Sequence, residues 1–179
     1  MRILYRLLLT FNATSLIIVI FLIKENIIIE HISNNFLYPN YISFSIYSFI
    51  PIFLTYISLL IGNLLATANI KMGTIKEIEL ANNAFLPSYL GYFFVALSVP
   101  NCSTLYFVFL ILFIFTFLSQ SLYFNPLFLF FGYHFYNITT SKNVKLFIIT
   151  RQNINDPNEV EFEKLKRINN FTFIDKQKL

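Results

Sequence analysis

The longest uncharged stretch of the chain runs over residues 80–141, where no Asp, Glu, Lys or Arg occurs. A soluble core segment is neither so long nor so apolar, whereas a membrane helix needs about 20 mostly apolar residues. We therefore predict a membrane hairpin with one helix over residues 85–100 and a second over residues 104–123. The sequence PNCS between them is a strong turn signal, and so short a connection makes the two helices antiparallel neighbours.

A first apolar segment opens the chain. Residues 1–23 begin with two arginines and continue into an apolar run, as a secretory signal does. However, Lys-Glu-Asn stands at positions 24–26, where a signal would have a small-residue cleavage site. We therefore predict an uncleaved first span. Its polar residues Asn12, Thr14 and Ser15 are costly against lipid, so we expect them to face other helices.

Residues 41–66 form a second predicted span, and Ser58, Gly62 and Ala66 recur along it at intervals of four. Small residues at this spacing let two helix backbones approach closely. One interpretation is an oligomer seam made by Ser58, Gly62 and Ala66. The other is ordinary packing inside one subunit, and the sequence leaves both open.

The distribution of basic residues orients the predicted spans. Arg2, Arg6, Lys71 and Lys76 fall on one side of a four-span topology, and Lys24 falls on the other. Cytoplasmic segments of membrane proteins carry the excess of Lys and Arg. We therefore expect both termini to be cytoplasmic.

The pattern changes after the hairpin. Residues 133–138 and 144–150 are rich in aromatic and β-branched residues, and the polar residues 140–143 between them predict a β-hairpin loop. A short third strand is expected at residues 171–174. Residues 127–131 are apolar but too short to cross a membrane, so we place them at the inner interface or in the core of the tail.

Residues 157–169 are predicted to be helical, because an Asp precedes a Pro at the first helical position and an acidic residue follows. The chain then divides into a four-helix transmembrane domain, residues 1–124, and a cytoplasmic C-terminal module, residues 125–179. The predicted fold class is an α-helical polytopic membrane protein: four transmembrane helices plus a small cytoplasmic α/β tail, with a β-hairpin and one helix.

Composition agrees with a membrane protein and narrows the chemistry. The chain is 56% hydrophobic and 12% charged, against about 25% charged residues in ordinary soluble domains. No phosphate loop, dinucleotide fingerprint, zinc spacing or nucleophile elbow occurs, so we expect no enzyme, cofactor or metal site. No charged residue lies inside the apolar run of a predicted span, which begins at Leu7 in the first span, and this argues against a transporter or proton pump.

Three features of the chain carry a family resemblance. They are the four-span plan, the Asn125-Pro126 exit leading to GYHFY at 132–136, and the ending EFEKLKRIN at 161–169 before FTF. With them the chain resembles the KwaA family, the membrane subunit of the Kiwa bacterial anti-phage defence system. The resemblance implies a homo-oligomer, a tetramer, in the bacterial inner membrane that senses phage attack. It also implies a cytoplasmic effector partner, KwaB, that binds DNA.

The residues and the resemblance together lead to one function and one alternative. The first is a non-enzymatic sensor and scaffold that detects membrane perturbation and recruits the effector through its tail. We expect the tail to bind that partner through these residues: Arg151, Lys164, Arg167, Phe171 and Phe173. Glutamates flank the basic cluster at 164–167, so we expect a mixed solvated helix face there rather than binding to nucleic acid or anionic lipid. For the chain as a whole we expect membrane lipid as a partner and no direct contact with nucleic acid.

The alternative is a small oligomeric channel or pore-forming toxin. It depends on the hydroxyl groups of the second span, at Ser43, Ser45, Tyr47, Ser48, Thr55 and Ser58. These groups would either line a narrow pore or form hydrogen bonds between helices.

Overall fold

The structure of the chain is a computed structural model that describes residues 2–33, 38–70, 73–84, 86–119, 125–157 and 160–177. Within these ranges, apolar helices lie at all four predicted span positions. Three are long enough to cross a membrane: α1 (Arg2–Lys24), α3 (Pro39–Ile61) and α5 (Cys102–Ser119). The fourth, α4 (Leu86–Ser98), has 13 residues.

Helix α4 is about 20 Å long at 1.5 Å per residue, whereas a hydrocarbon core is about 30 Å thick. Three candidate spans are present among the described residues. A total of four spans therefore stays a prediction. A short helix, α2 (Glu30–Ser33), lies in the connection between α1 and α3. The end of the fourth predicted span, at residues 120–123, lies outside the described residues.

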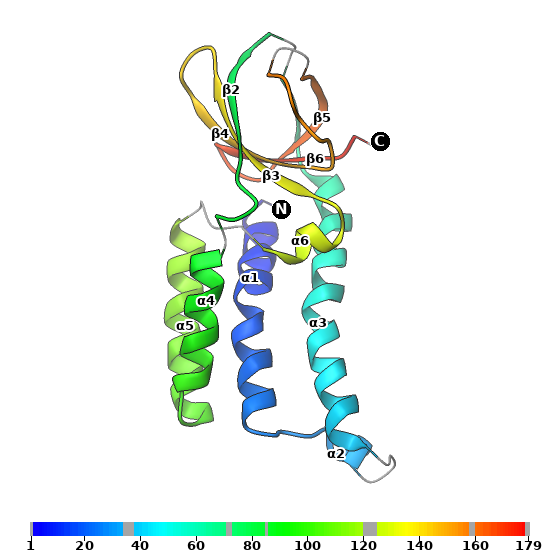
Figure 1. Ribbon diagram of the computed structural model, residues 1–179, viewed down its shortest axis with the longest axis vertical. Coiled ribbons are helices and arrows are strands. Elements are labelled where there is room, and N and C mark those ends of the chain that lie inside the picture. The colour runs from blue at the N-terminus through cyan, green and yellow to red at the C-terminus, as the bar shows by residue number, and fades with distance from the viewer. Residues whose placement is uncertain are drawn as a thin grey trace.

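Helix α1 lies between α3 and the α4–α5 pair and contacts all three (Figure 1). This position explains its polar residues, because Asn12, Thr14 and Ser15 are all buried against neighbouring helices. The prediction that they face other helices is confirmed. At the end of the bundle away from the sheet, the Lys24 ammonium group donates a hydrogen bond of 2.6 Å to the Val99 carbonyl, close to the end of α4.

Six strands form one sheet in the described residues, at the end of the bundle where α1 begins (Figure 1). The strands are β1 (Thr67–Ile70), β2 (Ile75–Leu80), β3 (His134–Thr140), β4 (Lys145–Thr150), β5 (Phe162–Arg167) and β6 (Thr172–Asp175). Their order is β1-β5-β6-β4-β3-β2, and only the β4–β6 pair is parallel.

The sheet is rolled. Strands β1 and β2 lie at opposite edges, yet the chain from the end of one to the start of the other covers at most about 18 Å. Both edges must therefore approach each other. Successive residues of a strand point to opposite faces: Tyr136 and Ile148 lie in the core inside the roll, whereas Phe135 and Ile149 lie in the core that faces the helices.

The hairpin and the third tail strand predicted from sequence are confirmed as β3, β4 and β6. The helix predicted at residues 157–169 is wrong, because Phe162–Arg167 form β5. Phe162 and Leu165 are three residues apart and both buried, a spacing that also suits a helix. Pairing of β5 with β1 and β6 overrides this local preference.

The connection between the second and third predicted spans, residues 67–84, supplies β1 and β2. The sheet therefore extends beyond residues 125–179. The apolar segment after α5 forms the short helix α6 (Leu127–Phe130), and the fully buried Phe128 belongs to the core between sheet and helices. Of the two predicted placements for this segment, the core of the tail is the one observed for Phe128.

Candidate functional site

The sheet meets the helical bundle at the end of α3, and the residue directly after β6 makes the contact. The Lys176 ammonium group, one residue after β6, donates a hydrogen bond of 2.6 Å to the Leu59 carbonyl of α3. Carbonyls in the last turn of a helix lack intrahelical donors, and a cation there interacts favourably with the helix dipole. Lys176 therefore connects the centre of the sheet to the end of a helix that is long and apolar enough to cross a membrane.

Tyr133 lies between two cations at this junction. The Arg151 guanidinium carbon is 4.6 Å from the centroid of the Tyr133 ring, and the Lys176 nitrogen is 5.5 Å from it. Both distances suit cation–π attraction. The pKa of Lys176 is lowered to about 8, mainly by burial and also by repulsion from Arg151, while the Asp175 carboxylate acts in the opposite direction. At neutral pH the amine is still mostly protonated.

Buried Asp175 fixes the backbone just before Lys176. Its carboxylate accepts hydrogen bonds from the Thr150 hydroxyl at 2.7 Å, the Gln152 amide at 3.0 Å and the Gln177 N–H at 2.9 Å. A buried carboxylate needs such donors, because an unpaired one is costly. The position of Lys176 is therefore set by a hydrogen-bonded strand end.

Gly62 permits α1, α3 and the end of β6 to approach one another. A Cβ at this position would lie 3.0 Å from the Tyr5 hydroxyl oxygen and 3.3 Å from Cε of Lys176. The Tyr5 side chain is buried, and its hydroxyl has no hydrogen-bond partner among the described residues. We call Tyr5, Leu59, Gly62, Tyr133 and Lys176 the junction.

A buried layer of polar side chains lies within the bundle, further along α1 and α3. The Asn12 amide of α1 donates to the Ser58 hydroxyl at 3.5 Å, and the Asn125 amide donates to the Thr55 hydroxyl at 3.2 Å. Thr55 and Ser58 in turn donate to carbonyls of their own helix. We call these four residues the polar seam.

The polar seam is not fully satisfied. The Asn12 side chain is completely buried, its one interhelical hydrogen bond is long at 3.5 Å, and its Oδ1 has no donor among the described residues. Leaving a buried acceptor unpaired costs about 1–3 kcal/mol. The observed packing of α1 against α3 thus contains a locally unfavourable contact.

The structure places the residues of the predicted oligomer seam differently from one another. Ser58 and Gly62 are buried inside the subunit, whereas Ala66 is exposed beyond the end of α3. Packing within one subunit accounts for the first two. A role for this stripe between subunits stays a prediction.

The predicted partner-binding residues of the tail do not form one surface. Arg151 belongs to the edge of the junction, Lys164 is exposed on β5, and Phe171 is 59% exposed in the turn before β6. The guanidinium of Arg167 donates to the Asn169 carbonyl and to the Asn170 side chain. Phe173 is buried inside the rolled sheet.

The hydroxyl groups of α3 also divide between two environments. Ser43, Thr55 and Ser58 are buried within the subunit, while exposed Ser45 and Ser48 donate to the carbonyls of Tyr41 and Phe44. They do not gather on one exposed face that would line a pore.

Sequence reasoning did not predict the junction. Tyr5, Tyr133 and Lys176 come from three distant parts of the chain, and no spacing or motif links them. Its only local signal is Lys176 itself, a basic residue directly after an apolar strand. In the part of the chain that the structure describes, no group of three or more His, Cys, Asp or Glu residues is placed to hold a metal ion.

Comparison with known protein families decides the identity. The family described as anti-phage protein KwaA matches residues 5–174 of the chain. The chain belongs to the KwaA family of anti-phage proteins. The match to KwaA includes Tyr5, Gly62 and Tyr133 of the junction and ends two residues before Lys176. No curated protein and no solved structure gives a significant match.

Proposed function

We propose that this member of the KwaA family is a non-enzymatic sensor and scaffold of the bacterial inner membrane, with both termini cytoplasmic. Its helices detect membrane perturbation by infecting phage, and its sheet recruits a cytoplasmic DNA-binding effector, KwaB, as the resemblance implies. The working form is a homo-oligomer, a tetramer by the same resemblance. The observation that supports this proposal most is the bond from Lys176 to the Leu59 carbonyl.

A sensor needs two packings whose balance the signal shifts. The polar seam supports this requirement, because Asn12 has an unpaired buried acceptor in the observed packing. A displacement of α1 relative to α3 that gives this oxygen a donor defines the second packing. Its free energy then lies close enough to the first for membrane perturbation to change the populations.

The junction would carry such a displacement to the sheet. Strand β6 lies between β5 and β4 in the interior of the sheet, and Lys176 follows it directly. Movement of α3 relative to the sheet stretches the bond between Lys176 and Leu59. The sheet responds as a unit, because β6 is paired on both edges.

The exposed turn between β5 and β6 is the surface we assign to the effector. Phe171 is 59% exposed there, and its carbonyl accepts a hydrogen bond of 2.7 Å from the Phe147 N–H of β4. An aromatic side chain on a rigid turn is typical of residues that dominate binding energy at interfaces. Phe171 directly precedes β6, so movement of the junction would also move Phe171.

Phe171→Ser is expected to weaken co-purification of the KwaB effector at least about tenfold, because an aromatic hot spot contributes about 2 kcal/mol or more. The measurement is the amount of effector recovered with the full-length chain from detergent. The matched control is Val144→Ser, since Val144 is also an exposed apolar residue, 41% exposed, beside a different turn. Equal recovery with Phe171→Ser and wild type would remove this surface from the proposal.

A further inference from the structure

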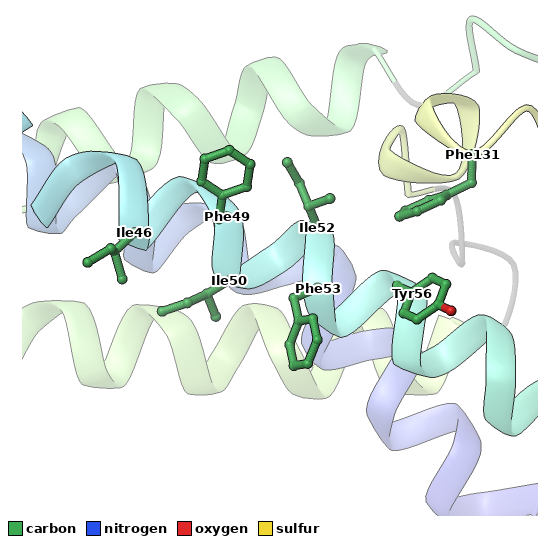
Figure 2. Close-up of a pocket in the computed structure, with 7 residues that line it drawn as sticks. All are labelled: Ile46, Phe49, Ile50, Ile52, Phe53, Tyr56 and Phe131. Atoms are coloured by element: carbon green, nitrogen blue, oxygen red, sulfur yellow. The ribbon is translucent and has the colours of Figure 1, made fainter. Parts of the chain in front are cut away.

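An apolar groove runs along the face of α3 that turns away from α1 (Figure 2). It is lined by Ile46, Phe49, Ile50, Ile52, Phe53 and Tyr56 of α3, and by Phe131 after α6. Its volume is about 540 Å³, within the range of about 300–1,000 Å³ found for ligand pockets. The groove lies on a helix long and apolar enough to span the membrane, so lipid is the surrounding solvent.

The side chains of the groove suit a hydrocarbon chain better than a second helix. Membrane helices pack closely through Gly, Ala, Ser and Thr, and the groove lining contains none of these. Ser43 and Ser58 of α3, and Gly62 directly after it, are buried within the subunit, and the exposed Ser45 and Ser48 do not line the groove. The groove therefore has the chemistry to hold a flexible acyl chain between bulky side chains.

The residues at the sheet end of the groove are close in sequence to the residues that contact Lys176 and Arg151. The rings of Tyr56 and Phe131 are 6.1 Å apart at this end, and Figure 2 shows Phe131 facing Tyr56 from the α6 segment. Leu59, whose carbonyl accepts a hydrogen bond from Lys176, is three residues after Tyr56. Tyr133, on which Arg151 stacks, is two residues after Phe131.

Two cations lie near the Tyr133 ring, two residues after the groove residue Phe131. Arg151 is exposed, and Lys176 is half-buried next to it. The Asp175 carboxylate opposes one of these charges and already accepts hydrogen bonds from Thr150 and Gln152. An exposed Arg151 stacked on Tyr133, so close in sequence to the groove residue Phe131, suits the phosphate of a lipid whose acyl chain occupies the groove, since Arg is well suited to bind phosphate oxygens.

We propose that the α3 groove and Arg151 form a binding site for one anionic phospholipid of the leaflet on the sheet side. The acyl chain lies against Phe49, Phe53 and Tyr56, and the lipid phosphate binds the Arg151 guanidinium. A lipid held in this way contacts both the membrane helix and the junction. The site does not depend on recruitment of an effector, so failure of either proposal leaves the other open to its own test.

The absence of tryptophan from the chain allows a direct test. Phe53→Trp places a single tryptophan in the groove, where Phe53 is 63% exposed, and Phe115→Trp places one on α5, where Phe115 is 64% exposed outside the groove. The full-length variants are reconstituted in bilayers that contain either brominated phosphatidylglycerol or brominated phosphatidylcholine. Bromine quenches tryptophan fluorescence only on contact, so quenching reports which lipid occupies the site.

The expected result is an about fivefold preference for the anionic lipid at Phe53→Trp, because one Arg contact contributes about that factor near a membrane surface. Phe115→Trp should show no preference, and Arg151→Glu should abolish the preference at Phe53→Trp. Ile50→Trp provides a second groove position with the same expectation. Equal quenching by both lipids in the groove, or preference retained with Arg151→Glu, would overturn the proposal. Absence of quenching by either lipid would overturn it in favour of a second protein copy in the groove.

Discussion

Gly62→Leu is expected to abolish protection against phage and to lower the thermal midpoint of the full-length chain by several degrees. A Cβ at position 62 already lies 3.0 Å from the Tyr5 oxygen and 3.3 Å from Cε of Lys176, so the larger side chain must displace both. Overpacking of this kind costs about 1–3 kcal/mol. It also separates Lys176 from the Leu59 carbonyl, which is the contact between sheet and helix. The measurements are plaque counts on cells that carry the complete defence system, and thermal unfolding in detergent.

Gly91→Leu is the matched control for Gly62→Leu. Gly91 is also a glycine in an apolar helix, but no atom lies within 4 Å of a Cβ built on it. This variant should protect cells and unfold as wild type does, and Gly62→Ala should fall between the two leucine variants. Similar behaviour of Gly62→Leu and Gly91→Leu would show that close approach at the junction has no functional importance.

Asn12→Leu is expected to raise the stability of the chain, whereas Gly62→Leu lowers it, and like Gly62→Leu it should reduce protection against phage. Leucine removes the unpaired Oδ1 acceptor from the interior of the bundle, which should stabilise the observed packing by about 1–3 kcal/mol. Ser58 keeps its hydrogen bond of 2.7 Å to the Thr55 carbonyl, so no new unpaired group is created. A chain held in one packing should then respond poorly to phage. The thermal midpoint should rise while protection falls.

Thr14→Val is the control for removal of a buried polar group from α1. The Thr14 hydroxyl donates to the Thr10 carbonyl at 3.0 Å and to the Phe11 carbonyl at 3.3 Å, both on its own helix. Protection should stay close to wild type in this variant.

Should Asn12→Leu lower the thermal midpoint instead, the polar seam would be a stabilising contact and not a strained one.

The apolar helices were predictable because their signal is local. Absence of charge over residues 80–141 and the two earlier apolar runs are enough to locate α1, α3, α4 and α5. Burial of Asn12 followed from the cost of an amide in lipid. The length of α4 was harder to predict, because an apolar run shows where a helix can lie and not where it ends.

The sheet was only partly predictable because its pairing is non-local. Strands β3, β4 and β6 carry aromatic and β-branched residues. In contrast, β2 has three charged residues among its six, a composition that also suits a loop, and β5 has helix-forming residues with a helical spacing. Both are strands because distant segments pair with them. No local pattern contains that information.

The candidate site was not predictable for a similar reason. The interval of Ser58 and Gly62 correctly indicated close approach, but a sequence does not say whether the approaching group belongs to the same subunit. In the structure the groups next to Gly62 are the side chains of Tyr5 and Lys176 of the same chain. Lys176 is more than 110 residues from Gly62 along the chain. Phe173 looked like a surface aromatic residue and is buried because the sheet rolls around it.

Hydrogen exchange of the full-length chain in bilayers tests most directly whether perturbation of the helices reaches the sheet. The reporter is the Lys176 amide, which donates to the Lys164 carbonyl at 3.2 Å, together with the amides of β6. Bilayers of short-chain phospholipid impose hydrophobic mismatch on the helices. Wild type should exchange these amides faster in thin bilayers than in thick ones, and Asn12→Leu should show the same slow exchange in both. Unchanged exchange of β6 in wild type, with faster exchange confined to α1 and α3, would contradict the coupling of helices to sheet.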